Sequence, residues 1–243
     1  MIINREKQVV EAFVALTDTL VSDFDALDFL SMLIERCTAL LDVTSAGVIL
    51  LDGQGGLSVA AASSERSRLL EVFAVAIDAG PCVECVRTGR AVSSPDLTLE
   101  PDAGRWPRFS SGAAEAGYRS VHALPMRLRD DVIGVLTLLH DAPHVLEEPD
   151  RRLGQALADA ATIGLLQERA VRHAETVAEQ LQLALNSRVI IEQAKGIAAG
   201  RAETTPDQAF TMLRGHARSK GLRLTALCRD VVDGTVSVDD LRR

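Results

Sequence analysis

Six basic side chains near the C-terminal end have spacings that would gather positive charge on one surface. The first two are seven residues apart on an expected helix, the next two are four apart on another, and the last two lie in the turn that follows. These candidate binding residues are Arg188, Lys195, Arg214, Arg218, Lys220 and Arg223. Such a patch suits contact with nucleic-acid phosphates, although a charge cluster is more often an ordinary solvated surface.

The sequence also contains one Cys-x-x-Cys pair, formed by Cys82 and Cys85. On a helix this spacing places both sulfur atoms on one face, as thiol exchange or metal binding would require. A structural zinc site needs two further ligands, and the sequence has no second Cys-x-x-Cys. His140 and His144 are four residues apart but flank Pro143, so they do not share a helix. We therefore predict no metal site and favour helix-facing thiols without chemistry over a redox pair.

The other common catalytic patterns are absent. The sequence has no Gly-x-Ser-x-Gly elbow and no glycine-rich phosphate loop of either common type. No pair among its many acidic residues stands out as a catalytic couple. The sequence therefore predicts a protein that is not an enzyme.

The apolar pattern of the first 165 residues predicts an α+β domain with an antiparallel sheet and flanking helices. Apolar residues three or four apart indicate helices, and short apolar runs between turn residues indicate strands. The expected helices cover 5–42, 65–78 and 82–88, with Gly89 after the last, and the expected strands cover 46–51, 57–62, 120–127 and 131–140. The last two strands pair across residues 128–130, and the mixture favours the α+β class.

From Pro149 onward the pattern is wholly helical. Apolar residues recur there with a heptad spacing that suits a seam against a partner helix, or packing on the chain's own sheet. The two heptad positions hold Leu153, Ala160, Gln167, Ala174 and Leu181, and Leu157, Gly164, Val171, Ala178 and Leu185. Because the apolar stripe extends beyond the length of helix that the preceding domain could cover, we predict a homodimer with a coiled-coil-like connector.

The tail is expected to form a unit of three helices. Thr205, Pro206 and Gln208 have the pattern of a capped helix start, and Gly221 is expected to end that helix. Its expected buried residues are Ala209, Phe210, Leu213 and Ala217. A further helix is expected to end at Gly234.

Composition indicates a globular protein whose charge is unevenly distributed. The 243 residues are 47% hydrophobic and 3% aromatic, with a formal net charge of −8. Residues 1–171 have 15 Lys or Arg and 25 Asp or Glu, a net of −10, whereas residues 172–243 have 11 and 9, a net of +2. No apolar run is long enough for a membrane span, and the first residues fit no signal peptide, so we expect a cytoplasmic protein.

The segment from Leu183 to Gly196, LALNSRVIIEQAKG, resembles the opening of the ANTAR domain, the RNA-binding output module of transcription antiterminators. The similarity continues through Pro206–Phe210, Leu213-Arg214, Ala217-Arg218, Leu224 and Val231-Val232. The resemblance implies a dimer that binds paired RNA stem-loops in a leader transcript and so prevents a terminator from forming. It implies RNA contact for Arg188, Lys195, Arg214 and Arg218, while Lys220 and Arg223 are added from charge alone.

The N-terminal part is similar to a GAF sensor domain. The similarity rests on the segment from Ala79 to Val92, AGPCVECVRTGRAV, and on Asp96-Leu97. The NKFDE-type motif of cyclic-nucleotide GAF domains is absent and no bilin-attachment site is evident, so ligand and cofactor stay unknown. We expect a GAF domain over 1–165, a helical connector over 166–187 and an ANTAR domain over 188–243.

These expectations combine into one hypothesis and two alternatives. A signal in the GAF domain would change the connector and so permit a pair of ANTAR units to hold two RNA hairpins. One alternative is a GAF-based redox enzyme resembling methionine sulfoxide reductases, which would use Cys82 and Cys85. The other is a dimeric small-molecule sensor that acts by protein contact and has no salt-dependent affinity for RNA.

Overall fold

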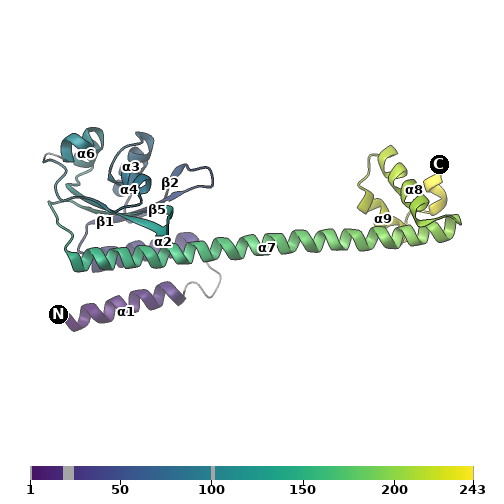
Figure 1. The fold of residues 1–243 in the computed structure, drawn as a ribbon, viewed down its shortest axis with the longest axis horizontal. Helices are drawn as coiled ribbons and strands as arrows, with labels where there is room; N and C mark the ends of the chain where they lie inside the picture. Colours follow the sequence, from purple (N-terminus) through teal and green to yellow (C-terminus); the bar gives the residue numbers. More distant parts are fainter. Residues whose placement is uncertain (1, 19–24, 100–101, 243) are drawn as a thin grey trace. The chain divides into compact units, whose positions relative to one another are not determined.

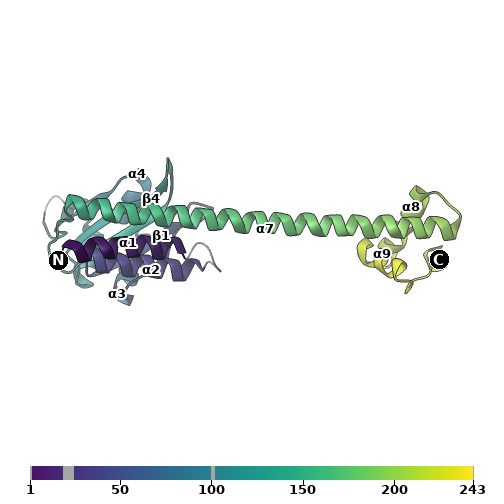
Figure 2. The same cartoon turned by 90° about the horizontal axis from the view of Figure 1, so that it is seen from below.

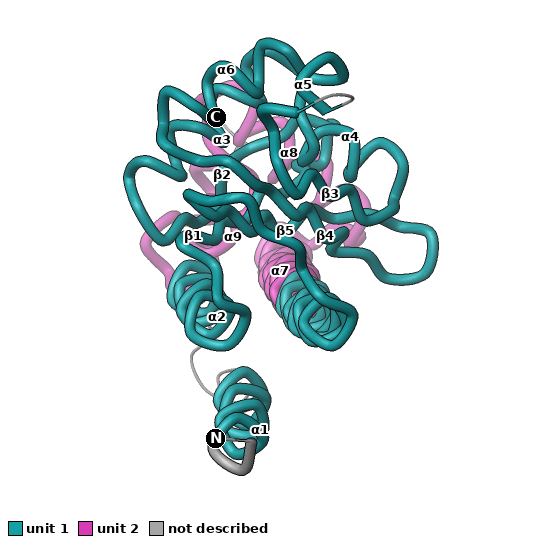
Figure 3. Tube along the Cα trace, turned by 90° about the vertical axis from the view of Figure 1, so that its left-hand side faces the viewer, with its two compact units in different colours: residues 1–169 teal, residues 170–243 magenta. Residues whose placement is uncertain are grey.

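The computed structural model describes residues 2–18, 25–99 and 102–242, in two compact units of residues 1–169 and 170–243 (Figures 1 and 3). The helices are α1 (Ile2–Asp18), α2 (Ala26–Leu40), α3 (Glu65–Ala76), α4 (Pro81–Thr88), α5 (Asp102–Arg105), α6 (Pro107–Glu115), α7 (Glu148–Ala202), α8 (Pro206–Ser219), α9 (Leu224–Val232) and the 3-10 helix η1 (Val238–Arg242). The strands are β1 (Ser45–Leu51), β2 (Leu57–Ala62), β3 (Val92–Ser94), β4 (Ser120–Leu128) and β5 (Asp131–His140). No helix in the described ranges is both long and apolar enough to cross a membrane.

The five strands form one antiparallel sheet in the order β2-β1-β5-β4-β3. The predicted hairpin is confirmed: Leu128 pairs with Asp131, and Arg129 and Asp130 form the turn between them. Arg129 has a backbone φ of 58°, in the region that usually favours glycine. The predicted α+β class and antiparallel sheet are therefore confirmed, while the three-residue edge strand β3 is an addition to the prediction.

Helices cover both faces of the sheet (Figure 3). On one face, α2 and the first part of α7 pack on a core that includes Leu33, Leu136, Leu138 and Leu157. On the other face, α3, α4 and α6 pack on a core that includes Leu70, Phe109, Tyr118, Val121 and Val135. Successive side chains of a strand point to opposite faces, so β4 and β5 supply both cores. This double burial explains their nearly continuous apolar sequences.

The expected single helix over 5–42 is wrong, because α1 ends at Asp18 and a new helix, capped by Asp25, begins at Ala26. The Asp25 carboxylate accepts hydrogen bonds from the backbone N–H groups of Leu27 (2.7 Å) and Asp28 (3.2 Å), which otherwise lack partners at a helix start. Figure 2 shows α1, α2 and the first part of α7 side by side. Arg5 of α1 links them, since it pairs with Asp150 of α7 and donates to the Leu40 carbonyl oxygen (3.2 Å).

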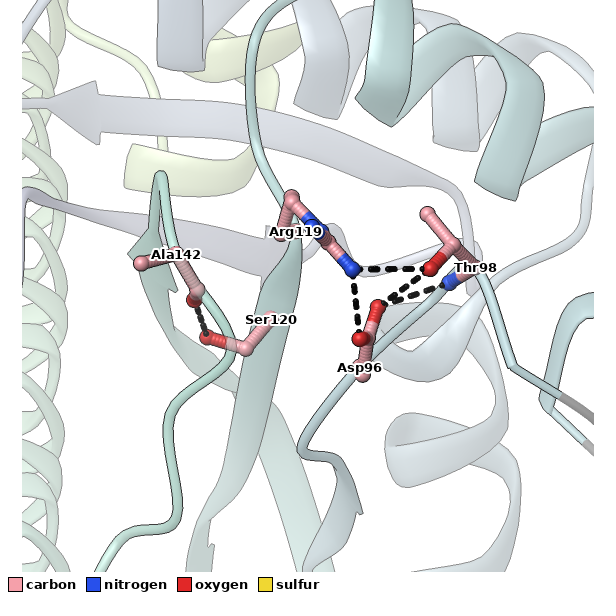
Figure 4. A network of polar contacts seen from close by, with 5 residues as sticks. All are labelled: Asp96, Thr98, Arg119, Ser120 and Ala142. Atoms are coloured by element: carbon pink, nitrogen blue, oxygen red, sulfur yellow. Dashed lines mark hydrogen bonds and ion pairs between the residues drawn. The ribbon is translucent and has the colours of Figure 1, made fainter.

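A polar network holds the segment after β3 against the start of β4 (Figure 4). Arg119 donates from Nη2 to Asp96 Oδ2 (2.6 Å) and to Thr98 Oγ1 (3.0 Å), and Thr98 Oγ1 donates to Asp96 Oδ1 (2.7 Å). The hydrogen bonds from Thr98 and, to a smaller extent, from Arg119 hold the pKa of Asp96 below its ordinary value. Next to Arg119, the Ser120 hydroxyl donates to the Ala142 carbonyl oxygen (3.1 Å) in the segment after β5.

Helix α7 confirms the predicted long helix and divides the heptad stripe between two environments. Leu157 and Gly164 are buried in the first unit, as packing on the chain's own sheet requires. Val171, Leu181 and Leu185 are 51%, 60% and 58% exposed. The second half of the stripe therefore lacks a cover within the described chain.

The second unit is helical, and its core lies between the end of α7, α8, α9 and η1. Thr205 and Gln208 form the predicted capping box, and Pro206 occupies the first turn of α8. The core includes Ala194, Ala198, Ala209, Leu213, Leu227, Cys228, Val231, Val238 and Leu241. The two members from η1 belong to an element that the sequence did not predict. Phe210 is half-buried, which corrects the expectation that it lies in this core.

Candidate nucleic-acid interface

Lys195 contacts both its own helix and α8. Its Nζ lies 5.6 Å from the centroid of the Phe210 ring and 3.0 Å from Glu192 Oε2. The side chain is only 17% exposed, so the ammonium group has a defined position. A cation over an aromatic face is attracted to the ring quadrupole. Phe210, which the sequence placed in the core, therefore positions a predicted binding residue.

The two arginines of α8 lie on its exposed face. Arg214 and Arg218 follow Phe210 by four and eight residues, which places all three along one side of the helix. Both arginines are exposed, whereas Leu213 and Ala217 face the core. The buried row thus holds α8 in place and leaves the guanidinium groups available to a partner.

The remaining predicted residues lie on the exposed surface of the same unit. Arg188 is exposed on α7, seven residues before Lys195. Lys220 caps the end of α8 and Arg223 precedes α9, so both occupy the predicted turn. Over the described ranges of the chain, Lys195 is the single member of the six with an ion pair. The other five charges are not neutralised by any carboxylate in the part of the unit that the structure describes.

The Cys-x-x-Cys pair of the first unit is poorly suited to redox chemistry. Cys82 and Cys85 lie on α4, and both are free and buried. Burial, reinforced by nearby negative groups, raises the pKa of each thiol to about 12. The thiolate is the reactive form of cysteine, so neither residue is a ready nucleophile near neutral pH.

Two of the buried polar residues in the same unit, Glu71 and His122, have shifted pKa values that the sequence does not predict. Glu71 of α3 is 2% exposed, and burial raises its pKa to about 8. The Thr137 hydroxyl lowers that pKa by a smaller amount, although it forms no hydrogen bond of normal geometry with the Glu71 carboxyl group. The second group is His122, whose pKa burial lowers to about 4.

His122 belongs to a cluster that the sequence could not reveal. The ring centroids of His122 and His144 are 5.7 Å apart, and those of His140 and His144 are 5.0 Å apart. These residues come from two strands and a loop, and sequence spacing does not report such a meeting. Where the structure describes the chain, no three His, Cys, Asp or Glu side chains are placed to hold a metal ion.

The structure has two parts, a mixed α+β domain and a helical unit in which five exposed cations form no ion pair with a described residue. A model of the GAF domain matches residues 25–166, and a model of the ANTAR domain matches residues 179–232. The chain therefore belongs to the GAF domain family and has the GAF-ANTAR architecture that its sequence resembles. This architecture indicates RNA-binding regulation of transcription by antitermination, with a sensor domain, rather than an enzyme.

Solved structures share the fold of the first unit. The GAF domain of an Acinetobacter phosphoenolpyruvate-protein phosphotransferase is 16% identical, with a TM-score of 0.52 over 67% of this chain and 95% of that one. The GAF domain of the corresponding Coxiella burnetii protein is 15% identical, with a TM-score of 0.52 over 69% and 98%. A free methionine-R-sulfoxide reductase from Neisseria meningitidis is 16% identical, with a TM-score of 0.52 over 67% and 91%. No curated protein matches the chain.

Proposed function

We propose that this protein is a signal-responsive antiterminator that binds paired RNA stem-loops in leader transcripts as a homodimer. The observation that carries the proposal is the ANTAR match over residues 179–232, which contains all six predicted binding residues. The residues that would contact the RNA are Arg188, Lys195, Arg214, Arg218, Lys220 and Arg223. We propose the divisions 1–165, 166–187 and 188–243 for sensor, connector and RNA-binding domain.

The charge arrangement supports a contact with phosphates. Five of the six cations have no ion pair in the described part of the unit, so binding them to phosphate breaks no internal bridge. Lys195 differs, because Glu192 and Phe210 already hold its ammonium group. We expect Lys195 to fix the geometry of the surface and the exposed arginines to supply most of the salt-dependent affinity.

The exposed half of the α7 stripe supports the homodimer. Ala174, Ala178, Leu181 and Leu185 continue the three-and-four spacing that two-stranded helical seams require. Their exposure in the single chain leaves apolar area that a second copy would bury. Because small residues weaken such a seam, a signal in the GAF domain would need little free energy to bias it.

A gel-shift titration with a two-hairpin RNA tests the proposal. The double variant R214Q/R218Q should lose at least about tenfold in affinity, with a shallower dependence on salt than the wild type. Arg229 is an exposed arginine of α9 outside the predicted set, and R229Q is therefore the matched control. Equal affinity for the wild type and R214Q/R218Q, or no salt-dependent binding at all, would contradict RNA binding through this surface.

A further inference from the structure

Three arginines line one pocket of the first unit. The pocket has a volume of about 610 Å³ and lies where the β4–β5 hairpin, the turn after α4 and the first part of α7 meet. Arg90 comes from the turn, and Arg127 and Arg129 come from the hairpin. This volume is within the range of about 300–1,000 Å³ that is usual for small-molecule sites.

The charge of these arginines is not used elsewhere in the described chain. Residues 1–169 contain 15 Lys or Arg and 25 Asp or Glu, and eight of these basic side chains form ion pairs with described residues. None of the three pocket arginines forms one with a described residue. Three unpaired guanidinium groups around one hollow of an acidic domain select a ligand with several negative charges.

A hydrogen bond to the local backbone holds the Arg127 side chain. Arg127 Nη1 donates to the Arg129 carbonyl oxygen (3.2 Å), which ties the two residues of the hairpin together. Arg129 has its left-handed φ of 58° at a turn position where glycine would be favoured. An arginine therefore occupies a turn position whose backbone conformation favours glycine.

Helix α7 supplies the remaining lining residues of the pocket. Gln155 Nε2 donates to the Pro125 carbonyl oxygen (2.9 Å) and to Asp159 Oδ1 (2.7 Å), which fixes the one carboxylate that lines the pocket. Ile163 adds an apolar side chain that is 52% exposed. A ligand here would contact α7 within the first unit.

We propose that this pocket binds a small phosphorylated compound with at least two negative charges. Guanidinium groups match phosphate oxygens with paired hydrogen bonds, while Asp159 would accept from a neutral donor on the same ligand. The role of this compound as the input signal of the sensor domain rests on the proposed RNA-binding function. The binding itself does not.

Calorimetric titration of the full chain with inorganic pyrophosphate, without divalent cations, tests the site. The wild type should bind one pyrophosphate saturably, and R90Q and R127Q should each weaken binding about tenfold. R129G should weaken binding similarly but keep or raise the melting temperature, because glycine suits the left-handed turn position. Arg108 is exposed on α6 and unpaired among the described residues, so R108Q serves as the control and should bind like the wild type.

Absence of saturable binding in the wild type, or an equal loss in R108Q, would overturn the proposal. Gel shifts with the two-hairpin RNA separate this site from the proposed function. R90Q and R129G should bind RNA like the wild type, and reduced RNA affinity in these variants would assign the pocket to RNA instead. If pyrophosphate binds as expected while no RNA binds, the pocket stands and the proposed function fails.

Discussion

The carboxylate of Glu71 packs directly against Gly47, so that a Cβ atom at position 47 would lie 2.2 Å from Glu71 Oε1. Strand β1 therefore needs a residue without a side chain at the point where α3 crosses it. Because Glu71 is also buried and has a raised pKa, this contact places a neutral acid in the core of the sensor domain.

Replacing Gly47 by alanine should destabilise the first unit. The added methyl group would collide with a buried side chain, and overpacking of this kind costs about 1–3 kcal/mol. Urea unfolding of G47A and the wild type gives the loss in the free energy of unfolding. G53A is the control, since a Cβ atom at Gly53 meets nothing within 4 Å. Similar losses for both variants would contradict a specific clash.

The pH dependence of stability should change in E71Q. A folded pKa of about 8 against an ordinary value of 4.5 means that folded Glu71 keeps its proton between these pH values while the unfolded chain loses it. The contribution of Glu71 to the free energy of unfolding of the wild type therefore falls as pH rises from 4.5 to 8, by at most about 1.4 kcal/mol per pH unit. Glutamine does not titrate, so E71Q should gain stability relative to the wild type as pH increases. A constant difference in melting temperature between pH 5 and 8 would refute this expectation.

Replacing Phe210 by leucine should weaken RNA binding through Lys195. Leucine retains apolar bulk but removes the ring that attracts the ammonium group, an interaction of about 0.5–1 kcal/mol at exposed sites. We expect a loss of about two- to fivefold in gel-shift affinity, with F210Y close to the wild type. Thermal unfolding of both variants shows whether folding accounts for the loss. An unchanged affinity in F210L would mean that the ring does not position Lys195 for RNA.

Charged substitutions on the exposed stripe of α7 should prevent self-association. L181D/L185D places two carboxylates in the proposed seam, where burial without partners is unfavourable. Sedimentation analysis should then give a monomer, whereas the wild type gives a dimer. Leu183 is 67% exposed but lies off the stripe, so L183D should stay dimeric. A monomeric wild type, or equal dissociation of both variants, would contradict the seam.

Sequence patterns were sufficient where one local signal determines the structure. The strand over 131–140 and the capping box at Thr205 and Gln208 follow from apolar periodicity and from helix-start chemistry, and both are confirmed. The break before α2 was missed because apolar spacing continues across it, while Asp25 alone marks the new start.

The remaining features depend on tertiary contacts. The edge strand β3 has three residues, and its pairing with β4 rather than its composition defines it. The contact between Lys195 and Phe210 and the meeting of His122 with His144 join distant segments, and no spacing rule reports them. The six binding residues stay predictions, since their roles depend on a partner.

Residues 169–186 of α7 are all exposed in the described chain, so no core holds this stretch of helix. Helical segments of this length are only marginally stable in water without tertiary packing. The backbone amides here should consequently exchange with solvent deuterium much faster than those around Leu157 or Ala198. Association of two copies would slow that exchange, which makes these amides a local reporter of assembly.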